Sequence, residues 1–230
     1  LQTEIDLKDA RIFIPEIGWV KSKMVETKLS FAAKFSEAGI NKIPSVKIMG
    51  GGLTLTGTAQ LKDKKFYEFN LINFGFGDTV VSGKILYDGA KWQIQLGGPK
   101  LDLTAFLNQE EQNDRKYVRG PPIKIDLKVD QIKLSPGRYL SNIDASLKND
   151  GLVWSDIKLK SDVSLKKPLQ VKPSPADTKK TLEINLSPSK GKRHLHVTGY
   201  DAGAVLKTFD IYKNIDGGKL ILEAYFEDMS

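Results

Sequence analysis

The chain has 230 residues, of which 40% are hydrophobic and 27% charged, a balance that excludes a disordered chain or a collagen-like fibre. It contains no cysteine, which excludes disulfides, thiolate nucleophiles and most structural zinc sites. No stretch approaches the roughly 20 apolar residues that a membrane-spanning helix needs. The net charge of +7 would suit an anionic partner, but Lys and Arg are scattered among apolar positions, which favours solvated strand faces.

The sequence begins without Met, directly in the alternating stretch LQTEIDL. We therefore expect residues 1–230 to form a single module that is a fragment of a longer protein. Within it, residues 172–180 (KPSPADTKK) have the composition of a flexible loop.

Apolar and polar residues alternate along most of the chain, from Leu53 and Leu55 to Leu195 and Val197. This period predicts an antiparallel sheet with one apolar face. The apolar phase changes from odd to even positions near Asp130, which requires a bulge or a bend there if both sets are to share a face. The fold class is therefore mainly β, and the sheet is expected to curve.

Two segments repeat the same turn, because residues 85–92 and 147–154 both place Asp-Gly three residues after an apolar residue and three before Trp. Asp-Gly between alternating runs favours a tight type I′ hairpin. Glycine pairs at Gly51 and Gly217 also precede similar alternating strands. These echoes indicate that the chain is built from related β units.

Only two short helices are predicted. One is expected within residues 103–115, with Thr104 as a possible cap. The other is expected over residues 201–215, where Asp201 is a plausible N-cap. Neither is long enough to cover the whole sheet.

Candidate catalytic and metal-binding patterns are weak. The stretch GFGDTVVSGK at residues 75–84 lacks the spacing of a phosphate loop, so its glycines indicate a turn. His194 and His196 share one strand face and could contact a metal, but a site would need further ligands, and two outward polar residues are the simpler interpretation. Trp92 and Trp154 follow their turns at the same offset, which favours packing over base or sugar stacking. We expect no enzyme activity and no cofactor.

Three stretches, FGFGDTVVSGKILYDGAKWQIQLGGPKLDLTAFL, PPIKIDLKVDQIKL and YDAGAVLKTFDIYKNIDGGKLILEAYF, together resemble the AsmA-like family. The similarity is to the C-terminal region domain of its YhdP- and TamB-type members. It lies in a hairpin ending in Trp, a GxxLDL strand before a short helix, and a DAG helix ending at GGxLxL. It extends from about Leu29 to the end of the chain.

The resemblance implies a long, curled antiparallel sheet with an open apolar groove. It also implies a bridge that moves phospholipid across the periplasm of a Gram-negative bacterium, between the inner and outer membranes. The expected partners are phospholipid acyl chains, neighbouring repeats of the full protein, and the inner membrane through an anchor outside this segment. The family supplies no catalytic residues.

The residues expected to line the groove are inward positions of the alternating strands: Leu53, Leu55, Phe69, Leu71, Ile94, Leu96, Leu101, Leu103, Ile125, Leu127, Ile184, Leu186, Leu220 and Leu222. The main alternative is a structural β scaffold for envelope assembly whose own side chains fill the space. Nucleic-acid binding is a less favoured alternative, because no aromatic residues interleave with a basic stripe.

Overall fold

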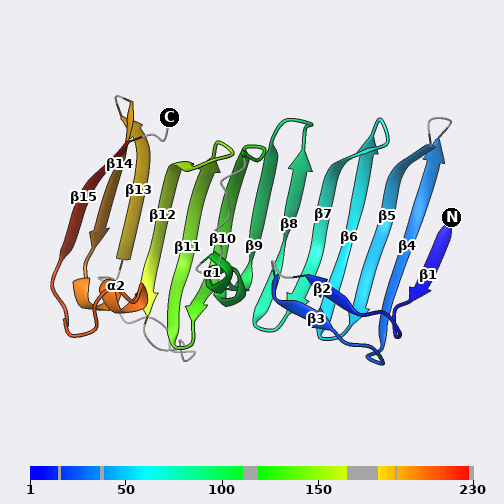
Figure 1. The fold of residues 1–230 in the computed structure, drawn as a ribbon, viewed down its shortest axis with the longest axis horizontal. Coiled ribbons are helices and arrows are strands. Elements are labelled where there is room, and N and C mark those ends of the chain that lie inside the picture. The colour runs from blue at the N-terminus through cyan, green and yellow to red at the C-terminus, as the bar shows by residue number, and fades with distance from the viewer. Residues whose placement is uncertain (15–16, 37–38, 111–118, 165–180, 190, 228–230) are drawn as a thin grey trace. The chain divides into compact units, whose positions relative to one another are not determined.

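The computed structural model describes residues 1–14, 17–36, 39–110, 119–164, 181–189 and 191–227 (Figure 1). They form two compact units, unit 1 (Leu1–Lys116) and unit 2 (Tyr117–Ser230). Both units are mainly β, as the sequence predicts, and each has an antiparallel sheet and one short helix. The expected loop at 172–180 lies outside the described residues, and a single module over 1–230 stays a prediction.

Unit 1 contains a sheet in which strands adjacent in the chain are mostly adjacent in space. Its strands, in spatial order, are β1 (Gln2–Asp6), β4 (Thr27–Ser36), β5 (Gly39–Gly50), β6 (Leu53–Lys62), β7 (Lys65–Phe76), β8 (Thr79–Tyr87) and β9 (Trp92–Asp102). A separate hairpin of β2 (Ile12–Ile14) and β3 (Trp19–Lys21) lies across the lower ends of neighbouring strands in Figure 1. Helix α1 (Thr104–Glu110) follows β9.

Unit 2 continues the same pattern of antiparallel neighbours. Its strands, in spatial order, are β10 (Ile123–Ser135), β11 (Arg138–Asn149), β12 (Trp154–Ser164), β13 (Thr181–Ser189), β14 (Lys192–Gly199) and β15 (Leu220–Glu227). Helix α2 (Ala202–Thr208) stands between β14 and β15 in sequence and packs on β11 and β12.

The predicted phase change near Asp130 occurs as a bend that β10 and β11 make together. Val129 faces Ile143, and three residues later Ile132 faces Leu140, with all four side chains buried. Asn142 has a left-handed backbone (φ 52°), and the β11–β12 register shifts at this point. The extra residue on β11 is a bulge, which turns the later apolar positions back to the same face.

The two Asp-Gly turns differ from the predicted tight type I′ form. Tyr87 pairs with Trp92 and Asn149 with Trp154, so each loop has four residues. In each loop the Asp side chain accepts two backbone N–H groups, from Ala90 and Lys91 in the first and from Leu152 and Val153 in the second. The aspartate side chain thus provides hydrogen-bond acceptors for loop N–H groups that have no partner across the hairpin. The two segments with similar sequences therefore also form the same type of loop.

Helix α2 is shorter than the helix predicted over residues 201–215, whereas residues 111–115 of the other predicted helix lie outside the described residues. Asp201 is the N-cap of α2, since its carboxylate accepts the N–H of Ala204 at 2.9 Å, but the helix ends at Thr208 and Phe209 is its C-cap. Thr104 is the first residue of α1 instead of its cap, and Asp102 accepts the Thr104 N–H. Neither helix in the described part of the chain has the length and hydropathy needed to cross a membrane.

Candidate functional site

The sheet of unit 2 carries two continuous rows of apolar side chains that run across its strands. Register places one residue from each of the six strands in each row. The first row is Ile125, Leu147, Ile157, Leu186, Leu195 and Ala224. The second row is Leu127, Ala145, Leu159, Ile184, Val197 and Leu222. These rows define the apolar face of unit 2.

Helix α2 covers one end of this face. Val205 of the helix lies against Gly199 of β14, where an added Cβ would stand 2.9 Å from the Val205 Cγ2. Around the helix, Leu140, Val163 and Leu182 are fully buried. Most of the two apolar rows, by contrast, is only half-buried, and Leu222 is 40% exposed. The face therefore has a packed end and an open part.

The glycine pair Gly217–Gly218 holds the start of α2 in place. Both glycines have positive φ (68° and 81°), which lets the chain turn sharply back into β15. Their carbonyls accept the N–H groups of Gly203 and Ala202 at 3.0 and 2.8 Å. Together with the Asp201 cap, they satisfy helix N–H groups that have no partner within the helix.

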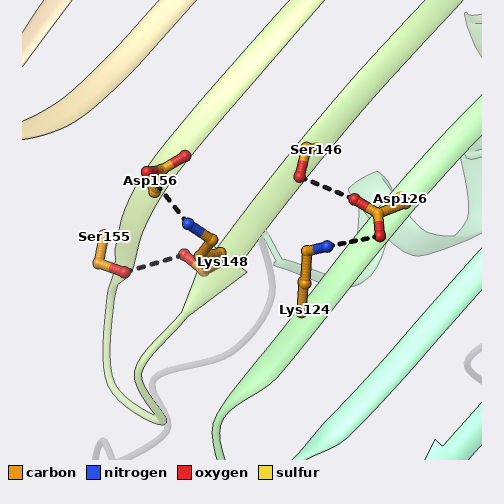
Figure 2. A network of polar contacts seen from close by, with 6 residues as sticks. All are labelled: Lys124, Asp126, Ser146, Lys148, Ser155 and Asp156. Carbon is orange, nitrogen blue, oxygen red and sulfur yellow. Dashed lines mark hydrogen bonds and ion pairs between the residues drawn. The ribbon is translucent and has the colours of Figure 1, made fainter.

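The opposite face of unit 2 is polar and is tied by cross-strand contacts (Figure 2). Lys124 lies 2.8 Å from Asp126, which also accepts the Ser146 hydroxyl at 2.8 Å. Burial alone would raise the pKa of Asp126, but the hydrogen bonds from Lys124 and Ser146 together bring that pKa below its ordinary value. The sheet of unit 2 thus has charged side chains on one face and apolar side chains on the other.

The predicted outward orientation of His194 and His196 is confirmed. Both imidazoles contact the carboxylate of Glu223 on the neighbouring strand β15, and His194 stacks on Tyr225 with ring centroids 4.7 Å apart. Hydrogen bonds with His196 and then His194 hold the pKa of Glu223 below its ordinary value. The described residues contain no group of three or more His, Asp or Glu suited to holding a metal.

Unit 1 has an apolar face of the same kind. Inward residues from neighbouring strands again face each other in rows. One row holds Leu29, Ile48, Leu55, Phe74 and Val81. Another holds Ile43, Ala59, Phe69, Ile85 and Ile94. Between them, the Phe69 ring covers Gly57, where an added Cβ would approach its Cζ to 2.6 Å.

The β2–β3 hairpin closes one end of unit 1. Trp19 is buried, and its indole N–H donates to the Gly51 carbonyl at 3.0 Å. Lys21 is fully buried, and its ammonium donates to the carbonyls of Leu7, Lys8 and Ala10. The three N–H donors of the ammonium group thus meet three acceptors.

The structure places the predicted groove residues on the apolar faces of the two units. In unit 1, Leu53 and Leu71 are buried core, while Leu55, Phe69, Ile94 and Leu96 are half-buried. Leu101 lies near the end of β9 and Leu103 directly precedes α1, so both are away from the middle of the face.

In unit 2, Ile125, Leu127, Ile184 and Leu222 are half-buried or exposed members of the rows. Leu186 is a buried member of the first row. Leu220 faces Gly199 next to α2.

Sequence reasoning omitted several residues of these faces from the predicted lining. Phe74 lies inward together with Leu71 because the β7–β8 register shifts between them, and simple alternation from Leu71 would place Phe74 outward. Leu147, Leu159 and Val197 follow the period and could have been included from the alternation alone.

Comparisons with known proteins add no family: no family model, no curated protein and no solved structure matches the chain.

Proposed function

We propose that this chain binds phospholipid acyl chains on its open apolar faces and has no catalytic role. The observation that carries this proposal is the pair of apolar rows across β10 to β15, which α2 covers only at one end. Side chains in a closed core lose nearly all contact with water, whereas Ile125, Leu159 and Val197 remain half-buried.

A continuous exposed apolar surface usually marks a site where an apolar ligand or partner binds. Burying an acyl chain contributes about 0.8 kcal/mol per methylene, and rows of Leu, Ile and Val offer no polar barrier along the face. The resemblance to AsmA-like proteins supports a phospholipid as that occupant. On this proposal the chain is a segment of a bridge across the periplasm, whose full-length protein is anchored in the inner membrane and carries phospholipid to the outer membrane.

The first prediction tests the apolar face with Leu222→Asp. Leu222 lies in the second row next to Val197, so the new carboxylate would stand where acyl chains are held. Since Leu222 is 40% exposed at an edge strand, the charge stays hydrated and the fold is retained. An ionised group against bound acyl chains costs several kcal/mol, so bound phospholipid should fall at least tenfold, measured by native mass spectrometry.

Ile221→Asp is the matched control, because it adds the same charge to the same strand on the opposite face, at a residue that is 59% exposed. Ile184→Lys places a charge in the same row on β13 and should also lose lipid. Circular dichroism monitors folding. Equal lipid loss in the inward and outward variants, or a wild-type chain that takes up no phospholipid, would refute the proposal.

A further inference from the structure

Aromatic residues lie on the apolar face of unit 1 at the strand ends that are opposite to the β2–β3 hairpin. Beyond Phe69, Ile85 and Ile94, register places Leu61 opposite Phe66 and Tyr87 opposite Trp92. The Trp92 ring lies 4.6 Å from the Tyr87 ring and 5.8 Å from the Phe66 ring, measured between centroids. Aromatic side chains that are apolar at one end and polar at the other favour a boundary between apolar and aqueous surroundings.

A cavity of about 250 Å³ lies beside these rings, between the β6–β7 and β8–β9 turns. Its lining includes Lys62, Lys65, Phe66, Tyr67 and Tyr87. We call this cavity the rim site. It is smaller than the pockets that enclose a whole small-molecule ligand, and it suits one polar group of a larger molecule.

The two lysines that line the rim site have no ion-pair partner among the described residues. Lys62 and Lys65 are exposed and face each other across the hairpin, and neither they nor Lys64 forms an ion pair with a described carboxylate. Two lysines directly opposite on paired strands repel each other.

Two aspartates also line the site. Asp88 is engaged by the N–H groups of Ala90 and Lys91, which hold its pKa below the ordinary value, and the Lys91 ammonium lies 4.0 Å away. The other is Asp63 in the β6–β7 turn, so the lining holds two lysines and two aspartates, and Lys64 adds a further positive charge in the same turn.

The turn that presents these lysines is strained. Asp63 and Lys64 have φ angles of 52° and 62°, the left-handed pair that a two-residue type I′ hairpin requires and that Asn-Gly normally supplies. Non-glycine residues in this conformation and the pair of opposed lysines both destabilise the turn. Such departures from local preference concentrate at functional sites.

We propose that the rim site holds the phosphate headgroup of a lipid whose acyl chains lie on the apolar face of unit 1. This inference depends on the proposed function and adds the recognised group. Acyl chains would contact Phe69, Ile85 and Ile94, the Trp92 ring would meet the interface, and the ammonium groups of Lys62 and Lys65 would contact phosphate oxygens. Charge-assisted contacts of this kind are about twice as strong as neutral hydrogen bonds.

The test presents the whole 230-residue chain with equal amounts of phosphatidylglycerol and diacylglycerol carrying identical acyl chains, in detergent micelles, and counts each bound lipid by native mass spectrometry. The wild-type chain should prefer phosphatidylglycerol by about tenfold, equivalent to about 1.4 kcal/mol. Lys62→Glu/Lys65→Glu should abolish that preference and leave diacylglycerol binding unchanged.

The matched control is Lys47→Glu/Lys158→Glu, which changes the net charge equally at two exposed residues of the polar faces. It should keep the preference. An equal loss in the control would assign the effect to overall charge and overturn the rim site, as would an unchanged preference in Lys62→Glu/Lys65→Glu.

Two further outcomes separate the proposals. If glycerol 3-phosphate displaces phosphatidylglycerol from the wild-type chain as effectively as the lipid itself, the site binds a soluble anion and the lipid headgroup assignment is wrong. Uptake of both lipids without preference would overturn only the rim site, whereas uptake of neither would overturn the proposed function as well.

Discussion

At the scale of single residues, a few polar groups hold the ends and turns of the two sheets. Lys21 fastens the segment around Leu7 to Ala10 in unit 1, and Asp150 organises the β11–β12 loop in unit 2. The two residues differ in environment, since Lys21 is fully buried and Asp150 is exposed. Substitutions of the two residues should therefore change the free energy of unfolding by different amounts.

Lys21→Met should destabilise unit 1 strongly. The methionine fills a similar volume but leaves the carbonyls of Leu7, Lys8 and Ala10 without the ammonium donor. A buried polar group left unsatisfied costs about 1–3 kcal/mol, so we expect a loss of about 3 kcal/mol in the free energy of unfolding, measured by urea denaturation. Lys23→Met, at an exposed position nearby, should change stability by less than about 0.5 kcal/mol. Similar values for the two variants would contradict the assigned role of Lys21.

Asp150 should give the β11–β12 loop a pH-dependent stability. Backbone hydrogen bonds from Val153 and Leu152 lower the pKa of Asp150 in the folded chain. A lowered folded pKa means that the contribution is complete above the ordinary carboxyl pKa and disappears as the pH falls through the folded value.

Asp150→Asn should therefore be less stable than wild type near neutral pH, by less than about 1 kcal/mol because the group is exposed. The difference should vanish in acid below the folded pKa of Asp150. Urea midpoints of both proteins across the acid range measure this, and a difference that grows on acidification would show the opposite linkage.

At the scale of elements, short helices and a hairpin close one end of each apolar face. In unit 2, α2 fits because Gly199 of β14 has no side chain where Val205 packs. In unit 1, the β2–β3 hairpin approaches α1 at Gly18, where an added Cβ would stand 2.8 Å from the Ala105 Cβ. These glycines set how closely each covering element can pack.

Gly199→Ala should displace α2 and cost about 1–3 kcal/mol, since overpacking a filled contact forces neighbouring atoms apart. Val205→Ala in the same chain should relieve the clash, so the double variant should be more stable than the sum of the single effects by at least about 0.5 kcal/mol. Thermal or urea unfolding of the four proteins completes the cycle. Gly75→Ala serves as control, because the nearest atom to its added Cβ is 3.9 Å away. Strict additivity of Gly199→Ala and Val205→Ala would mean that the two positions do not interact.

At the scale of the whole molecule, each unit is built on one large sheet with a polar side and an apolar side, and unit 1 has the separate β2–β3 hairpin in addition. Ion pairs such as Lys160–Glu183 and Lys128–Asp144 lie on the polar side and are exposed, so they add little to stability. Strands β1 and β15 are the outer strands of their sheets, and β15 exposes Ile221, Leu222 and Tyr225. An exposed edge of this kind can pair with a further strand.

The sequence by itself determined the alternating strands, most of their inward and outward residues, the phase change near Asp130, and the Asp201 cap. These features are local, since strand alternation and capping depend on residues a few positions apart. Thus Leu220 and Leu222 take the predicted inward orientation while Glu223 faces the histidines.

Only the tertiary structure decided which distant residues share a row, how far α2 extends, and where the faces are closed. Ile125 and Ala224 belong to one row through four intervening strands, a relation fixed by register and not by spacing. The helix from Asp201 stops at Thr208 although apolar residues continue to Ile215, because the chain must turn back to enter β15. The rim site likewise depends on two hairpins that bring Lys62 and Tyr87 together from separate parts of the chain.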